Sequence, residues 1–273
     1  MKIACSTSAF RTSLDMALER VAGLGFRYVD LITIGGWDHV DADRLVSDWD
    51  READRVEGLL NAAGMVPLAL NVAVETLHDR TPAVCRARSR KLDAVVRLMK
   101  RLGVLVASFY PGYKTADRPW SAVCEDEAAT LEEMMALGTT NGVTLALEFH
   151  FDTPFQTVEQ CTRLIDRVPG LPVAFDPSHF AMQGPSMDQA APLIDRAVHV
   201  HVRDAAPSKM QAACGQGSVN IPALIARLKH RDYNGVISVE YLPDAGFSVE
   251  ENIVRVKETI ETVWKAGQAA LYK

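Results

Sequence analysis

The sequence has few cysteines, and they follow no pattern that forms a disulfide framework or a zinc knuckle. The five cysteines are scattered over 273 residues, their number is odd, and no two are spaced as CxxC. Reduced thiols of a cytosolic protein fit this distribution best.

Long apolar runs are also missing. No run approaches the roughly 18 apolar residues that a membrane-spanning helix needs. The residues from Met1 to Ser6 pass directly into polar sequence, without the apolar segment of a signal peptide. We therefore expect a soluble, cytoplasmic protein that has no membrane partner.

Neither a basic block nor a glycine-rich phosphate loop is present. Lysine and arginine number 29 against 35 aspartates and glutamates, which gives a formal net charge of -6. Such a surface repels a polyphosphate on average, so a nucleic-acid partner is disfavoured. No GxGxxG or Walker A motif follows the first predicted strand, which disfavours a doubly wound nucleotide-binding sheet.

What the chain does contain is a strict alternation of apolar strands and amphipathic helices. Strands are predicted at residues 3–5, 26–34, 66–72, 104–109, 143–147, 173–175, 197–200 and 236–239. Helices are predicted at residues 13–22, 42–63, 83–102, 125–140, 155–168, 188–195, 222–230 and 249–266. Alternation at this spacing indicates parallel βαβ units. Eight units without a linker predict an α/β protein, a single (β/α)8 TIM barrel that forms one domain over residues 1–273.

Four successive strands in the C-terminal half end in a residue type that binds metal. These residues are Glu148, Asp176, His201 and Glu240. Side chains alternate between the two faces of a strand, so each carboxylate shares its face with small residues such as Ala146, Ala174 and Ser238. All four side chains should therefore point into the mouth of the barrel at the carboxyl ends of the strands.

Three carboxylates and one imidazole gathered in one place would repel each other if they had no counter-charge. A single acidic residue after a strand is usually a helix N-cap or a loop residue, but that explanation is poor for four strand ends together. A divalent cation would balance most of the charge. Oxygen-rich ligands with one imidazole suit Mn²⁺, which we take as the first choice, or Mg²⁺, Co²⁺ and Zn²⁺.

Five motifs, in this order, resemble those of the xylose isomerase-like TIM-barrel superfamily. The motifs are Leu147-Glu148-Phe149-His150, Phe175-Asp176-Pro177-Ser178-His179, His199-Val200-His201-Val202-Arg203-Asp204, Gly215-Gln216-Gly217-Ser218-Val219-Asn220 and Val239-Glu240. Within the superfamily, the sugar phosphate isomerase/epimerase group is the most similar; it includes ketose 3-epimerases, hydroxypyruvate isomerase and inosose dehydratase. The usual last aspartate of the glycine-containing motif is replaced by Asn220.

The resemblance implies roles for the predicted site residues. Glu148, Asp176, His201 and Glu240 would be the metal ligands, and Glu148 and Glu240 would also be the catalytic acid and base. His179 would contact a substrate oxygen, and Arg203 would lie at the rim and bind a substrate hydroxyl or carboxylate.

Three further residues keep two interpretations each. His150 is either a substrate or second-layer contact or a plain loop residue. Trp37 either forms part of an apolar wall against a sugar or simply covers the core. His199, deeper on the face of His201, is more readily a hydrogen-bonded core residue than a ligand.

The chemistry that these residues support is proton transfer next to a carbonyl. Removal of that proton builds negative charge on oxygen, which a metal ion stabilises as an enediolate, and a glutamate on each side could remove and return the proton. We expect a sugar isomerase or epimerase acting on a ketose or small keto acid, with a dehydratase of the inosose or 3-dehydroshikimate type as the alternative. Repair endonucleases of the endonuclease IV type share the fold but need further histidines on early strands. A homo-oligomer is compatible with the resemblance.

Overall fold

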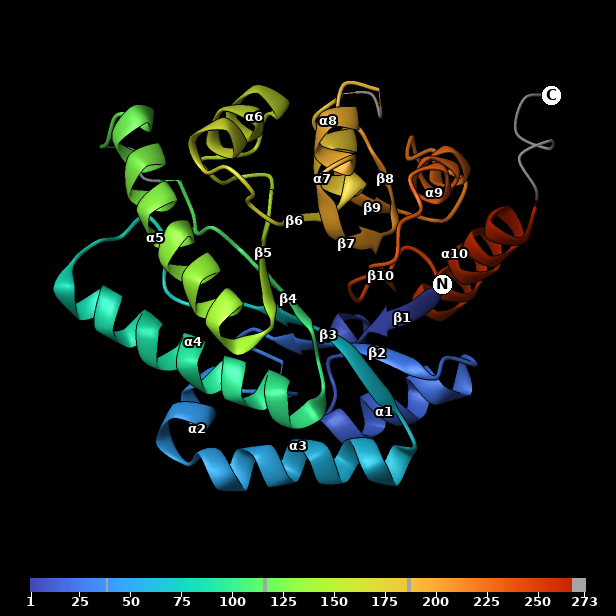
Figure 1. Ribbon diagram of the computed structural model, residues 1–273. Helices are drawn as coiled ribbons and strands as arrows, with labels where there is room; N and C mark the ends of the chain where they lie inside the picture. Colours follow the sequence, from blue (N-terminus) through green and yellow to red (C-terminus); the bar gives the residue numbers. More distant parts are fainter. Residues whose placement is uncertain (38, 115–116, 186–187, 267–273) are drawn as a thin grey trace.

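Eight parallel strands close into a barrel, which confirms the predicted (β/α)8 architecture (Figure 1). The computed structural model describes residues 1–37, 39–114, 117–185 and 188–266. Around the barrel the strands follow the order β1, β10, β7, β6, β5, β4, β3, β2. Their bounds are β1 Lys2–Ser6, β2 Tyr28–Thr33, β3 Val66–Val72, β4 Val106–Phe109, β5 Thr144–Glu148, β6 Val173–Phe175, β7 Ala197–Val202 and β10 Val236–Val239.

Helices connect the strands and lie around the outside of the barrel (Figure 1). They are the 3-10 turn η1 Thr7–Ala9 and α1 Leu14–Gly23, α2 Ala42–Ser47, α3 Trp49–Ala63, α4 Pro82–Leu102, α5 Trp120–Asn141, α6 Val158–Arg167, α7 Pro177–Ala181, α8 Ala191–Ile194, α9 Ile221–His230 and α10 Val249–Lys265. Within the described ranges, none of these helices is both long and apolar enough to cross a bilayer.

Two helical regions differ from the prediction. The expected helix at residues 42–63 is broken into α2 and α3 at Asp48, whose backbone (φ -151°, ψ 78°) is not helical and whose carboxylate caps α3. The short helix α7 was not predicted. It begins at Pro177, because proline is well suited to the first position of a helix. Asn220 caps α9 by accepting a hydrogen bond from the amide of Ala223, a role its side chain fills as well as the aspartate usual there.

A short antiparallel hairpin, β8 Asp204–Ala206 and β9 Lys209–Ala212, follows β7 and was not predicted. In its turn Ser208 has a positive φ of 64°. Glycine or asparagine is the usual residue at such a position, so the sequence gives no signal for this turn. The hairpin contacts α7, so it covers the mouth of the barrel next to β6 and β7.

The inward faces of several strands carry small residues, as the alternation of side chains predicts. Ala69, Val106, Ala146 and Ala174 form a cluster of their own inside the barrel, separate from the large core between strands and helices. These short side chains leave room in the lumen for the longer polar side chains that lie on the same faces.

The glycine-containing motif wraps around one buried carboxylate. Asp204 accepts hydrogen bonds from the backbone amides of Ala205, Gly215, Gly217 and Val219 at 2.8 to 3.2 Å. A carboxylate that accepts several amide hydrogen bonds is strongly held, and it fixes the loop between β9 and α9.

We predict that Gly217→Ala destabilises the protein by about 1 to 3 kcal/mol, because an added Cβ would lie 2.1 Å from Asp204 Oδ1 and 2.3 Å from the Ala205 carbonyl. Gly58→Ala is the matched control. Gly58 is exposed within α3 and has nothing within 4 Å of an added Cβ, so this variant should gain about 0.5 to 1 kcal/mol. Urea unfolding curves measure the change in the free energy of unfolding for each variant. An equal change in the two variants would contradict the close approach at Gly217.

A buried histidine–carboxylate pair joins the loop before α4 to α5. His78 Nδ1 lies 3.3 Å from Glu127 Oε2, and both side chains are at most 1% exposed. Burial raises the pKa of Glu127 from 4.5 to about 7, and the neighbouring His78 only partly opposes that effect.

The raised pKa of Glu127 predicts that stability falls as the pH rises from about 4.5 to 7. Between these pH values the Glu127 carboxyl loses its proton in the unfolded chain but keeps it in the folded chain. Glu127→Gln removes the effect, so the wild-type protein should lose about 2 to 3 kcal/mol relative to this variant between pH 4.5 and pH 7.5. Urea unfolding of both proteins at several pH values measures the difference, and parallel pH curves would disprove the assignment.

Candidate active site

The four predicted ligands come together at the mouth of the barrel. Glu148, Asp176, His201 and Glu240 each offer one ligand atom, these atoms all lie within 4.8 Å of one another, and all four residues are buried. His201 Nδ1 is 2.7 Å from Glu148 Oε1 and 3.5 Å from Glu240 Oε2. Both glutamates therefore lie close to the same ring nitrogen, one from β5 and the other just after β10.

Asp176 has two functions at once. One carboxylate oxygen, Oδ1, accepts a hydrogen bond of 2.8 Å from the Ser178 amide and so caps α7. The other, Oδ2, lies 2.9 Å from the Arg203 guanidinium and faces the cluster. The cap orients the side chain, which leaves one oxygen free to act as a ligand.

Arg203 lies inside the site, deeper than the rim position that the sequence suggests. Its side chain is only 3% exposed. Its guanidinium nitrogens lie 2.9 Å from Asp176 Oδ2 and 3.1 Å from Glu240 Oε2, and its Nε donates to Ser178 Oγ. Arg203 thus bridges two of the three carboxylates and supplies a permanent positive charge to the cluster.

The rings of His179 and His150 lie against each other beside the carboxylates, tilted by 43°. The two rings have centroids 3.7 Å apart, and Tyr110 meets His150 edge to face at 5.2 Å. His179 Nε2 is 3.5 Å from Asp176 Oδ2 and 3.9 Å from Glu148 Oε1. His150 Nδ1 is 2.7 Å from the carbonyl of Phe151, so one nitrogen of that ring is already engaged by the loop.

Burial and neighbouring charges move the pKa values of these groups in different directions. Burial raises the pKa of Glu240 to about 7, although His201 and Arg203 pull it down. Burial would also raise the pKa of Glu148, but the charge and the hydrogen bond of His201 outweigh burial and lower that pKa.

The pKa values of the two histidines move in opposite directions. Burial would lower the pKa of His201, yet Glu240 and Glu148 raise it well above its usual value. Burial and the charges of His150 and Arg203 hold the pKa of His179 well below its usual value, which keeps that ring neutral.

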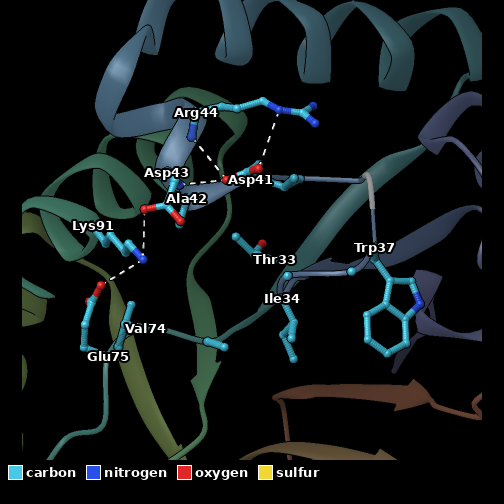
Figure 2. Close-up of a pocket in the computed structure, with 14 residues that line it drawn as sticks. Thr33, Ile34, Trp37, Asp41, Ala42, Asp43, Arg44, Val74, Glu75 and Lys91 are labelled. Atoms are coloured by element: carbon cyan, nitrogen blue, oxygen red, sulfur yellow. Dashed lines mark hydrogen bonds and ion pairs between the residues drawn. The ribbon is translucent and has the colours of Figure 1, made fainter. Parts of the chain in front are cut away.

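Trp37 is the predicted site residue that lies apart from this cluster. Its Nε1 donates to the Ser8 carbonyl, its ring lies under Arg11, and it lines a cavity of about 550 Å³ at the ends of β2 and β3. One side of this cavity is lined by an ion-paired chain, in which Lys91 lies between Asp43 and Glu75 (Figure 2). The Lys91 ammonium is 2.9 Å from the Asp43 carboxylate and 2.8 Å from the Glu75 carboxylate.

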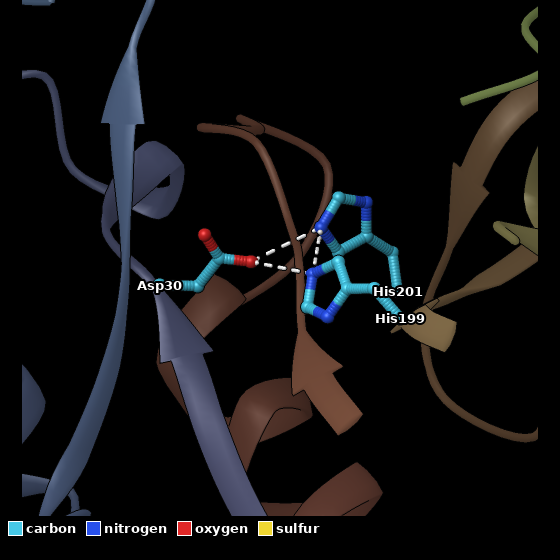
Figure 3. Close-up of side chains that lie close together, drawn as sticks. All are labelled: Asp30, His199 and His201. Carbon is cyan, nitrogen blue, oxygen red and sulfur yellow. Dashed lines mark hydrogen bonds and ion pairs between the residues drawn. The ribbon is translucent and has the colours of Figure 1, made fainter. Parts of the chain in front are cut away.

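Sequence reasoning missed two residues that touch the cluster. Asn71, on β3, donates a hydrogen bond of 2.8 Å to Glu240 Oε1. Asp30, on β2, contacts both His199 and His201 (Figure 3). His199 is a buried, hydrogen-bonded residue as expected, but its partner could not be identified. The only available signals were a lone aspartate inside an apolar strand and an amide at the end of the next strand.

The donor set fits a divalent cation. Three hard carboxylates and one borderline imidazole are a combination that divalent ions such as Mn²⁺ and Zn²⁺ bind. With Arg203 included, a divalent ion would leave the cluster with no net charge. Glu148, Asp176, His201 and Glu240 therefore form a potential metal-binding group, whose individual roles stay predictions.

Comparisons with known proteins agree with this fold. A curated inosose isomerase from Bacillus velezensis is 22% identical over 272 residues, with 94% of each chain covered. A D-tagatose 3-epimerase-like protein of known structure has a TM-score of 0.75 at 19% identity, covering 96% of this chain and 97% of its own. A 3-keto-D-glucoside 4-epimerase from E. coli has a TM-score of 0.74 at 14% identity, covering 96% and 99%.

A structure of the IOLI protein, which carries a zinc atom, has a TM-score of 0.72 at 21% identity and covers 97% of this chain and 98% of its own. At these identities the structural likenesses establish the fold alone. The family model described as "Xylose isomerase-like TIM barrel" matches residues 18–272. The chain therefore belongs to the xylose isomerase-like TIM-barrel family.

Proposed function

We propose that the protein is a divalent-metal-dependent isomerase or epimerase that moves a proton next to the carbonyl of a ketose or small keto acid. The observation that carries the proposal is the pair of buried glutamates, Glu148 and Glu240, which both lie within 3.5 Å of His201 Nδ1. The inosose isomerase and sugar epimerases to which the chain is similar support a small sugar-like substrate.

The two glutamates suit opposite halves of a proton transfer. Their surroundings push their pKa values apart, with Glu148 lowered and Glu240 raised to about 7. A pair of carboxyls separated in this way can divide the roles of base and acid. Ionised Glu148 would accept a proton from the carbon next to the carbonyl, and Glu240 would hold a proton for return. Attack from opposite faces inverts a carbon centre, which favours epimerisation.

The other polar residues would bind and orient the substrate. Neutral His179 can donate to or accept from a substrate hydroxyl, and its contact with the tilted ring of His150 holds it in place. Arg203 balances Asp176 and Glu240 so that the buried carboxylates stay close. The rings of His179, His150 and Tyr110 provide aromatic surface that a sugar could contact.

Glu148, Asp176, His201 and Glu240 would hold the metal ion, for which we propose Mn²⁺ first and Mg²⁺, Co²⁺ or Zn²⁺ as alternatives. Bound there, the ion would act as a Lewis acid for the negative charge that develops on the substrate oxygen.

We predict that Glu148→Gln and Glu240→Gln each slow deuterium exchange at the carbon next to the carbonyl by at least about 100-fold, since each removes a proton-transfer group. The measurement is proton NMR in D₂O on Mn²⁺-loaded protein with a panel of ketoses, inososes and small keto acids. Glu127→Gln is the matched control, because Glu127 is an equally buried glutamate with a pKa of about 7 outside the site, and it should exchange like the wild type.

Metal content must be measured in the same samples, since both glutamates are also proposed ligands. A variant that keeps its ion and loses exchange identifies a proton-transfer role. A wild-type protein that exchanges no proton in any compound of the panel would contradict the proposed function.

Removal of the ion tests the metal dependence separately. We expect chelation with EDTA to abolish exchange and added Mn²⁺ to restore it, because the residues alone provide no Lewis acid for the developing charge. Exchange that survives complete chelation would disprove metal dependence.

The reaction product distinguishes an isomerase or epimerase from the alternative, a dehydratase. Inosose dehydratases from Salmonella share 25% identity over 146 residues, 46% of this chain, and a lyase would use the same first proton removal. A new epimer or isomer supports the proposed function, whereas a product that has lost a hydroxyl assigns the protein to the dehydratases.

A further inference from the structure

A second polar cluster lies in the lumen directly against the potential metal-binding group. It consists of Asp30 from β2 and His199 and His201 from β7, and all three side chains are fully buried (Figure 3). Asp30 Oδ2 is 3.0 Å from His199 Nε2 and 3.1 Å from His201 Nε2. His201 belongs to both clusters through different ring nitrogens.

We infer that Asp30 is a positioning residue that holds the proton of His201 on Nε2, so that Nδ1 is the nitrogen left to bind the metal ion. An imidazole has one lone pair to offer a metal, and the hydrogen bond made by the other nitrogen decides which atom that is. In this structure Nδ1 faces Glu148 and Glu240, while Nε2 faces Asp30. The inference rests on the metal site proposed above.

His199 supports the same arrangement. Its Nε2 lies 2.8 Å from His201 Nε2, and the two rings meet edge to face at 86°. A contact of 2.8 Å between two ring nitrogens is a hydrogen bond in which one nitrogen carries the proton and the other accepts it. A proton on His201 Nε2 faces both Asp30 Oδ2 and His199 Nε2. His199 thus lies beside Asp30 as a second partner of that nitrogen.

Asp30, His199 and His201 could also be considered as ligands of a second ion. Charge argues against that assignment. A divalent ion there would face one carboxylate, whereas the adjoining cluster offers three, and a fully buried excess of positive charge is costly. The two neutral imidazoles need only one carboxylate as a hydrogen-bonding partner, without a second ion.

Small residues on the neighbouring strands leave room for this cluster inside the barrel. Strand pairing places Asp30 opposite Ala69, and His199 opposite Ala174. Ala69 and Ala174 have no side chain beyond Cβ, so the carboxylate and the two rings can meet inside the barrel.

The test is Zn²⁺ binding to Asp30→Asn, an isosteric change that removes the charge and gives the amide a donor to present to His201 Nε2. We expect a 10- to 100-fold weaker affinity, the range known for the loss of an outer partner of a metal-bound histidine, with one ion per chain at saturation. Chelator competition measures the affinity and elemental analysis the stoichiometry. Nitrogen NMR of the zinc-loaded wild-type protein should show the His201 proton on Nε2.

Glu127→Gln is the matched control, since it also removes a buried carboxylate beside a histidine, and its zinc affinity should equal that of the wild type. His199→Gln keeps Asp30 and should weaken binding by less than Asp30→Asn does. It also provides a second variant if Asp30→Asn fails to fold.

The results of these measurements distinguish the positioning role of Asp30 from the metal site on which that role depends. A wild-type protein that binds no Zn²⁺ overturns the metal site itself. Wild-type affinity in both Asp30→Asn and His199→Gln, or a proton found on His201 Nδ1, overturns only the positioning role. Two ions in the wild type and one in Asp30→Asn would make Asp30 a ligand and also overturn it.

Discussion

The site depends on the balance of charge among buried groups at the mouth of the barrel. Glu148, Asp176 and Glu240 are each at most 6% exposed. Three carboxylates at such short distances would take up protons or move apart without counter-charges. Arg203 supplies one positive charge, in contact with Asp176 and Glu240, and the divalent ion proposed above would supply the rest. His201 contacts Glu148 and Glu240 and, as a neutral ring, would bind that ion. Removal of Arg203 would leave uncompensated charges in a place that water scarcely reaches, which is the costly case for buried ion pairs.

The barrel makes that concentration of charge possible. Parallel strands bring their carboxyl ends to one rim, so residues more than fifty positions apart in the chain, such as Glu148 and His201, come within hydrogen-bonding distance. Rigid strands hold these side chains more accurately than loops would. Small residues on the inward faces leave space for the polar ones, while the larger apolar residues pack outward against the helices.

The polar residues are arranged in layers that differ in character. Asp30 and His199 lie deepest and are fully buried, the carboxylates and His201 lie above them, and the neighbouring rings of His179 and His150 adjoin these. In the function we propose, the inner layer would fix positions, the middle layer would offer ligands and proton-transfer groups, and the rings would contact a substrate. The same separation of pKa values that supports an acid and a base, lowered at Glu148 and raised at Glu240, follows from these surroundings.

The sequence by itself determined the barrel and the four ligand-type residues, because the alternation of elements and the face on which each side chain lies are local properties. Glu148, Asp176 and Glu240 could be found as strand ends that break an apolar run. Only the tertiary structure decided that Arg203 turns inward to bridge two carboxylates, that Asp30 reaches His201 across the lumen, and that Trp37 lies over a separate cavity. Those contacts join residues up to 171 positions apart. They depend on strand register and on the path of loops such as the β8–β9 hairpin, which no local pattern specifies.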